Sequence, residues 1–158
     1  MIARKQNVPM TGKEARTEQS LTTPDLVCFS HLRWDFVLQR PQHLMSRFAK
    51  SPQHLLSRAA KDRRVFFIEE PIFGNSSMRF DVSERDNGVR LVVPHLPEGL
   101  RSEVATAAVL REMVDRLFLK HSINDYVLWY YTPMALEVST HLRPVAAIYD
   151  CMDELSAF

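Results

Sequence analysis

The sequence predicts an α/β fold, in which a mostly parallel β-sheet is covered by helices on both faces. Continuous apolar runs at 25–30, 65–70, 126–131 and 145–149 are typical of strands that are buried on both sides. Helical patterns separate most of these runs, and strands that alternate with helices pair in parallel through right-handed crossovers. With 158 residues, of which 46% are hydrophobic, the chain has room for one core.

The order of the elements follows from local signals along the chain. Residues 1–24 are polar and without apolar periodicity, so we expect a disordered tail followed by one domain over 25–158. After the first strand, Arg40 is pushed away from helical geometry by Pro41, which itself suits the first position of a helix. We therefore expect a helix to begin at Pro41.

This helix contains an internal repeat, because residues 41–50 recur almost unchanged at 52–61. The offset is close to three helical turns, which would keep one apolar stripe in phase across both copies. Pro52 opposes a continuous helix, since a proline in a helix interior loses a hydrogen bond and clashes with the preceding turn. We expect a break or a sharp kink near Ser51.

The second half of the chain predicts a hairpin and two further strand and helix pairs. The runs 78–82 and 89–93 flank a turn that contains Asn87 and Gly88, which tolerate a positive φ. The set Leu110, Met113, Val114, Leu117 and Phe118 indicates an amphipathic helix from 102 to about 121. A strand at 126–131, a short helix at 133–141 and a strand at 145–149 complete the order β-α-β-β-β-α-β-α-β.

Composition argues against several classes of function. The net charge of +1 provides little long-range attraction to nucleic acid. Cys28 and Cys151 form no CxxC pair, so we expect neither a metal site nor a disulfide framework, and the reducing cytoplasm fits best. The four glycines lie far apart, which excludes a glycine-rich nucleotide loop. The basic segment 40–64 could meet phosphate or the inner face of an anionic membrane, or it could form a solvated helix face.

Polar side chains follow most of the predicted strands. In parallel α/β sheets, ligands bind outside the carboxyl ends of the strands, so these side chains are candidates for a site. Polar ends also arise wherever a strand emerges into solvent. The candidates are Ser30, His31, Trp34, Glu69, Glu70, His95, Tyr131, Thr132, Asp150 and Asp153.

Four motifs in the chain together resemble a known family. They are Trp34-Asp-Phe-Val-Leu-Gln-Arg-Pro-Gln-His43, Phe67-Ile-Glu-Glu-Pro71, Trp129-Tyr-Tyr-Thr-Pro133 and Tyr149-Asp-Cys-Met-Asp-Glu-Leu-Ser-Ala-Phe158. The region from Asp25 to Phe158 resembles the N-terminal half of bacterial glycosyltransferases of the glycosyltransferase-B fold. These enzymes are of the teichuronic-acid and exopolysaccharide type and are sometimes fused to a UDP-galactopyranose mutase.

The resemblance implies a Rossmann-like domain that forms the acceptor side of a transferase cleft, with a nucleotide sugar as donor and a saccharide or lipid-linked acceptor. No metal or cofactor is implied. Asp35 and Glu69 would be the catalytic carboxylates, Arg40 would pair with phosphate and Trp34 would stack on a sugar. Asp35 and Arg40 could instead pair with each other, and Asp153 could cap a helix. The residues expected to bind substrate are His31, Trp34, Gln39, Arg40, Thr132, Asp150 and Asp153.

The chain stops at Phe158, so the resemblance implies an incomplete N-terminal domain and no donor-binding domain. We expect such a truncated chain to be inactive alone and to need a donor-domain chain or a second copy. The alternative is a noncatalytic, partner-binding α/β domain that docks through its sheet edge and its basic helix.

Overall fold

The computed structural model describes residues 23–36, 40–49, 63–74, 77–85, 88–101 and 103–150. The predicted tail lies outside these residues apart from its last two, and so does the second copy of the repeat. The described elements, in chain order, are β1 (Asp25–Phe29), α1 (Arg40–Ala49), β2 (Val65–Ile68), β3 (Ile72–Phe73), β4 (Arg79–Glu84), β5 (Val89–Leu96), the 3₁₀ turn η1 (Glu98–Leu100), α2 (Glu103–Lys120), β6 (Tyr126–Tyr130), the 3₁₀ turn η2 (Pro133–Ala135), α3 (Leu136–Ser139) and β7 (Ala146–Tyr149).

The strands form one sheet in the order β3-β5-β2-β1-β6-β7, with β4 paired to β5. Every pairing is parallel except that of β4 with β5, which is the predicted hairpin. Gly88 in the hairpin turn has a φ of 80°, a conformation that disfavours other residues. The prediction of a mostly parallel α/β sheet is confirmed, and β1 at its centre makes the fold Rossmann-like.

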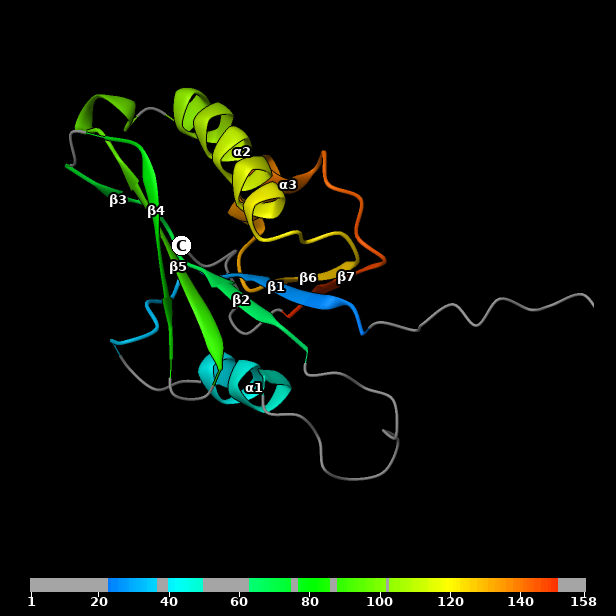
Figure 1. Cartoon of the computed structure of the whole chain (residues 1–158). Helices are drawn as coiled ribbons and strands as arrows, with labels where there is room; N and C mark the ends of the chain where they lie inside the picture. Colours follow the sequence, from blue (N-terminus) through cyan, green and yellow to red (C-terminus); the bar gives the residue numbers. More distant parts are fainter. Residues whose placement is uncertain are drawn as a thin grey trace, which may run out of the picture.

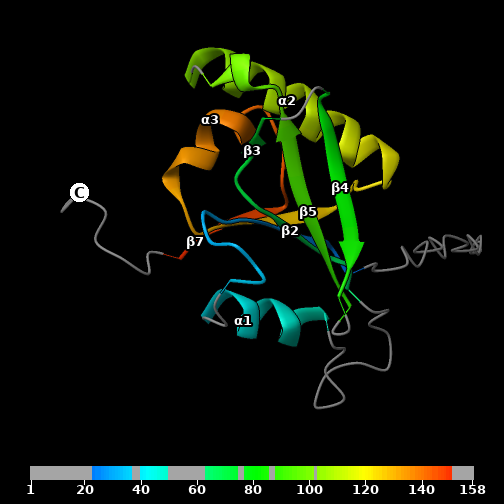
Figure 2. The ribbon, with the colours of Figure 1, turned by 90° about the vertical axis from the view of Figure 1, so that its left-hand side faces the viewer.

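Helices cover both faces of this sheet, as Figures 1 and 2 show, with α1 on one side and α2 and α3 on the other. The side chains of β1 alternate between the two layers. Leu26 and Cys28 belong to the cluster beneath α1, whereas Val27 and Phe29 belong to the cluster under α2. This two-sided burial explains why the strands read as continuous apolar runs. Within the part of the chain that is described, no helix is long and apolar enough to cross a membrane.

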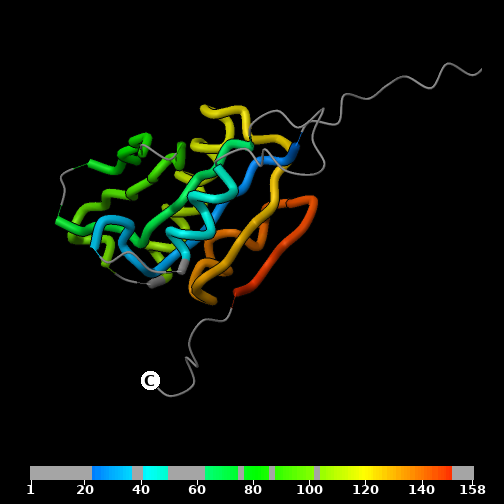
Figure 3. Tube along the Cα trace, turned by 90° about the horizontal axis from the view of Figure 1, so that it is seen from below, coloured from blue at the N-terminus to red at the C-terminus, as the bar shows by residue number. Residues whose placement is uncertain are grey.

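The two edges of the sheet differ. In the view along the sheet in Figure 3, β7 forms the edge opposite the hairpin. All four residues of β7 are exposed although their sequence is Ala-Ala-Ile-Tyr, and Val145 just before it is 60% exposed. An apolar strand with both faces open differs from β1 and β2, whose residues are all buried.

Arg64 connects the amino end of β1 to the end of α2 through an ion pair and hydrogen bonds. Its guanidinium binds the buried carboxylate of Asp25, with Nε donating to Oδ1 at 2.7 Å. Nη1 donates to the carbonyl of His121 at 2.7 Å and Nη2 donates to that of Ser122 at 3.1 Å. Ser122 adopts a φ of 50°, the left-handed conformation in which helices commonly end. One cation therefore satisfies two carbonyls at the helix terminus and one buried acid.

The second strand is interrupted where the predicted strand 65–70 should have continued. Each residue of β2, up to Ile68, pairs with the β5 residue 24 positions later in the sequence. Ile72 and Phe73 of β3 instead pair with the β5 residues 23 positions later. The change of one residue defines a bulge at 69–71, which bends the chain and redirects its side chains. Neither this bulge nor the short strand β3 was predicted from the sequence.

We predict that the Cys28 thiol is protected in the folded protein. It is fully buried in β1, and burial raises its pKa well above the usual value, with the negative charge of Asp150 adding to the effect. Since only the thiolate reacts, alkylation in a Cys151→Ser background should be at least about a hundredfold slower in buffer than in denaturant. Rates of iodoacetamide labelling within tenfold of each other would contradict this burial.

Candidate functional site

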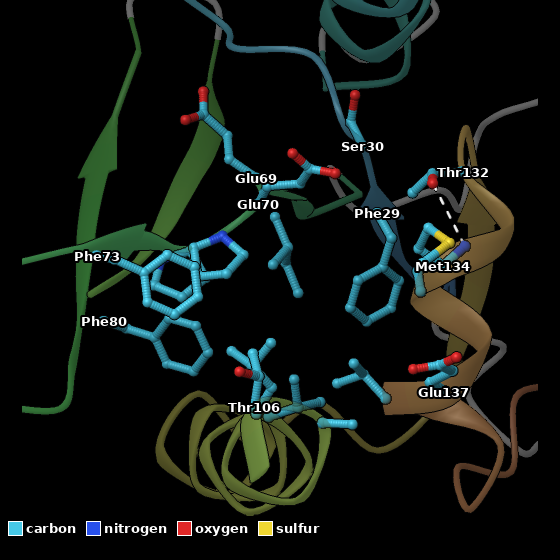
Figure 4. Close-up of a pocket in the computed structure, with 18 of the residues that line it drawn as sticks. Phe29, Ser30, Glu69, Glu70, Phe73, Phe80, Thr106, Thr132, Met134 and Glu137 are labelled. Carbon is cyan, nitrogen blue, oxygen red and sulfur yellow. Dashed lines mark hydrogen bonds between the residues drawn. The ribbon is translucent and has the colours of Figure 1, made fainter. Parts of the chain in front are cut away.

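A cavity of about 330 Å³ lies at the carboxyl ends of the parallel strands, on the face covered by α2 and α3. Its floor is apolar, and Figure 4 shows Phe73 and Phe80 on one side and Phe29 on the other. Thr106 on α2 and Glu137 on α3 also face the cavity in this view. The size and the mixture of apolar floor with a few polar groups are typical of small-molecule sites.

The cavity lies at the point where the strand order reverses. From β1 the chain first adds β2 on one side, and later returns to add β6 on the other side of β1. The crevice between the carboxyl ends of two such strands is where open α/β sheets bind their ligands. Phe29 at the end of β1, Ser30 just after it and Thr132 two residues after β6 all line the cavity, so it opens at this switch point.

Glu69 holds the loop after β1 against the bulge. Its Oε1 accepts a hydrogen bond of 2.6 Å from the backbone N–H of Trp34, and its Oε2 pairs with Nη1 of Arg33 at 2.9 Å. The same Arg33 donates from Nη1 to the carbonyl of Glu70 at 2.7 Å. Glu69 is 7% exposed, so its charge is compensated within the protein. The Glu69 carboxylate is thus occupied as a structural clamp.

Two hydroxyls on the other strands are oriented by local hydrogen bonds. Ser30 Oγ accepts a hydrogen bond of 3.0 Å from the N–H of Leu32. Thr132 precedes Pro133 at the start of η2, and its Oγ1 accepts a hydrogen bond of 3.4 Å from the N–H of Met134, drawn as a dashed line in Figure 4. This arrangement caps the turn and leaves the Thr132 hydroxyl proton available to the cavity.

Two other carboxylates of the cavity lining are uncompensated. Glu70 and Glu137 are both exposed, and neither side chain makes a hydrogen bond or an ion pair with another described residue. The guanidinium of Arg101 also lines the cavity, but it lies 4.7 Å above the Phe73 ring and pairs with Glu98 at 2.6 Å. The described rim therefore carries a net negative charge.

Trp34 was expected to stack on a sugar, but in this structure its side chain is largely buried. Trp34 is 8% exposed, and its ring packs edge to face on Phe67 with centroids 4.9 Å apart. The loop folds back beneath the sheet because the N–H of Trp34 is bound by Glu69 and its carbonyl accepts a hydrogen bond from Gln42 Nε2 at 3.2 Å. This burial could not be predicted from the sequence, because the neighbours of Trp34 include polar and charged residues typical of an exposed loop.

Asp35, the other predicted catalytic carboxylate, does not line the cavity. Its side chain is 70% exposed and forms an ion pair with Arg85, which follows β4. The alternative pairing of Asp35 with Arg40 involves a side chain outside the described part of the structure. Of the two predicted carboxylates, Asp35 is therefore turned to solvent, whereas Glu69 lines the cavity and is bound by Arg33 and the Trp34 N–H.

The remaining predicted residues are distributed around the carboxyl edge. Thr132 lines the cavity together with Glu69, whereas His31 and Asp150 are partly buried outside its lining. Arg40 begins α1, but its side chain lies outside the described part of the structure. Gln39 and Asp153 also lie outside the described residues.

Several residues around the site could not be predicted from the sequence patterns. Glu137 and Arg101 lie in or beside helices, where strand-end reasoning does not look. Arg33 and Gln42 were not singled out, although both bind the loop that Glu69 holds. For Glu137 the available signal was charge, because it sits between apolar residues in the sequence.

Comparisons with protein families, with curated proteins and with solved structures find no match to this chain. Across the described ranges, no three His, Cys, Asp or Glu side chains are grouped in a way that could hold a metal ion.

We predict that Arg33→Ala lowers the free energy of unfolding by about 1–3 kcal/mol, because it leaves the buried Glu69 carboxylate without its cation and two carbonyls without a donor. The matched control is Arg116→Ala, which removes an exposed i,i+4 pair with Glu112 and should cost less than about 0.5 kcal/mol. Urea unfolding measures both, and equal losses would contradict the clamp.

Proposed function

We propose that this chain is the acceptor-side domain of a glycosyltransferase. It would hold a cell-envelope or exopolysaccharide acceptor while a sugar is transferred to it from a nucleotide sugar. The single observation that carries the proposal is the cavity at the strand switch point, where an apolar floor is combined with hydroxyls and carboxylates at the rim. The described parts of the four sequence motifs that resemble this family lie at or near the same edge of the sheet.

In glycosyl transfer, an acceptor oxygen attacks the anomeric carbon of the donor, the bond to the diphosphate breaks and the acceptor hydroxyl loses its proton. A carboxylate within hydrogen-bond reach can hold the hydroxyl and take the proton. Glu70 is the residue that we assign to this role, since it lines the cavity and its carboxylate is not engaged by any described partner. Asp35 does not line the cavity, and the Glu69 carboxylate is already bound by Arg33 and the Trp34 N–H.

The donor would be held by a second domain in this proposal, because the described rim has a net negative charge that repels a diphosphate. The chain alone should then bind acceptor without transferring sugar. Incubation of radiolabelled UDP-sugars with a lipid-linked or octyl glycoside acceptor tests this, with the chain alone and with the polypeptide encoded beside it. Transfer only in the mixture, lost with Glu70→Gln, supports the proposal. Absence of acceptor binding and of transfer would overturn it.

We predict that Ala107→Phe weakens binding of octyl glucoside at least about tenfold, because the ring would fill the cavity that Ala107 lines on α2. Ala108→Phe is the matched control, since Ala108 is its exposed neighbour on the same helix and does not line the cavity. Ligand-observed NMR measures both affinities, and thermal unfolding confirms that both variants fold. Equal weakening by the two variants would place the ligand elsewhere.

A noncatalytic partner-binding domain is a second candidate, and the exposed apolar strand β7 favours it. Ile148 and Tyr149 are 38% and 51% exposed on the edge strand of the sheet, which leaves main-chain groups for another strand. If a second copy pairs there, sedimentation should show dimerisation that depends on protein concentration, and Ile148→Lys should weaken it at least about tenfold by placing a charge in the contact. A chain that stays monomeric up to millimolar concentration would contradict this candidate.

A further inference from the structure

The cavity has a charge pattern that restricts what it can bind. Four ionised side chains line it, namely the carboxylates of Glu69, Glu70 and Glu137 and the guanidinium of Arg101. Two of these four are neutralised by neighbours outside the lining, since Glu69 pairs with Arg33 and Arg101 pairs with Glu98. The charges that remain for a ligand are the two carboxylates of Glu70 and Glu137.

These two carboxylates are placed at different sides of the mouth. In Figure 4, Glu70 lies on the side of β2 near Ser30, and Glu137 projects from α3 on the far side of the cavity. Both groups can only accept hydrogen bonds when ionised. The hydroxyl of Thr132, which also lines the cavity, can donate or accept. A polar head at this position therefore meets mainly acceptors, and it must donate hydrogen bonds.

The apolar floor of the cavity favours a ligand with an apolar portion. Phe29, Phe80, Leu110 and Val114 come from three separate elements and converge beneath the rim. A cavity lined in this way gains free energy from each methylene group that leaves water. An alkyl chain or an apolar ring can pack against the floor. A head group without negative charge is not repelled by the carboxylates at the rim.

We propose that the cavity binds an amphiphile with an apolar body and a head that donates hydrogen bonds and carries no negative charge, such as a hydroxyl or an ammonium group. A phosphate or carboxylate head is rejected at the rim. The identification of this ligand with the transferase acceptor rests on the proposed function, and it assigns the acceptor an uncharged or cationic group beside its apolar portion. The charge preference itself follows from the cavity.

Three probes of equal chain length test the preference, namely octylamine, 1-octanol and octanoate, each titrated into the full chain at low salt and pH 7 with ligand-observed NMR. We expect the order octylamine, octanol, octanoate, with octylamine binding about tenfold more tightly than octanoate at close approach to two carboxylates. The double variant Glu70→Gln and Glu137→Gln should remove the preference between amine and acid, and it should weaken octanol binding less than octylamine binding, because octanol loses a hydrogen bond to a charged acceptor but no ion pair.

Two controls locate the effect. Glu112→Gln and Glu84→Gln remove exposed carboxylates that do not line the cavity, and they should leave all three affinities unchanged. Ala107→Phe should abolish binding of all three probes, whereas Ala108→Phe should not. Octanoate that binds as tightly as octylamine, or a preference that survives the double variant, would overturn the charge assignment. Failure of all three probes to bind would overturn the cavity as a ligand site.

The outcomes also separate this inference from the proposed function. If octylamine and octanol bind with the expected order but no saccharide acceptor binds and no sugar is transferred, the cavity assignment stands and the transferase proposal fails. If a saccharide acceptor binds and octanoate is as good a probe as octylamine, the charge assignment fails and the transferase proposal stands.

Discussion

The contact that organises the site is the pairing of the Glu69 carboxylate with Arg33 and with the backbone N–H of Trp34. It joins the loop after β1 to the bulge after β2, two segments that are far apart in the chain. A buried carboxylate left without these partners would be strongly unfavourable, so the loop has one arrangement in which the charge is satisfied. The loop then carries Trp34 into the core and directs α1 across the opposite face. Glu69 and Ser30 also line the cavity on the α2 face, so the start of this loop and the bulge both border the site.

Much of the fold could be predicted from the sequence because the central strands β1 and β2 are buried on both faces. The apolar run at 145–149 was expected to be buried in the same way, but β7 is exposed. Residues 25–30, 65–70 and 126–131 are continuous apolar runs, and the helix over 103–120 has a clear apolar face. The hairpin could be predicted because Asn87 and Gly88 tolerate the positive φ of a tight turn. The bulge at 69–71 could not be predicted in this way, since it depends on the offset between β2 and β5 and on a cation supplied by a distant loop.

The candidate site was only partly accessible to sequence reasoning. The rule that ligands gather at the carboxyl ends of strands selected Ser30, Glu69, Glu70 and Thr132, and all four line the cavity. It also selected Trp34, whose burial is decided by a hydrogen bond of its main chain rather than by its neighbours in sequence. Glu137 and Arg101 come from the helical side, and their positions depend on how α2 and α3 pack on the sheet. That packing is a tertiary property, which periodicity alone does not give.

The strand order also has a consequence for the order in which the molecule assembles. β4 and β5 are neighbours in sequence, and their hairpin closes a short loop, whereas the pairing of β1 with β6 joins positions separated by roughly one hundred residues. Local hairpins form in microseconds, and distant parallel pairings are slower because the entropy of closing the chain is lost before the contacts are made. We expect the hairpin and α2 to be structured early and the junction of β1 with β6 to form late. The cavity opens at that junction, so the site is completed only in the last stage of folding.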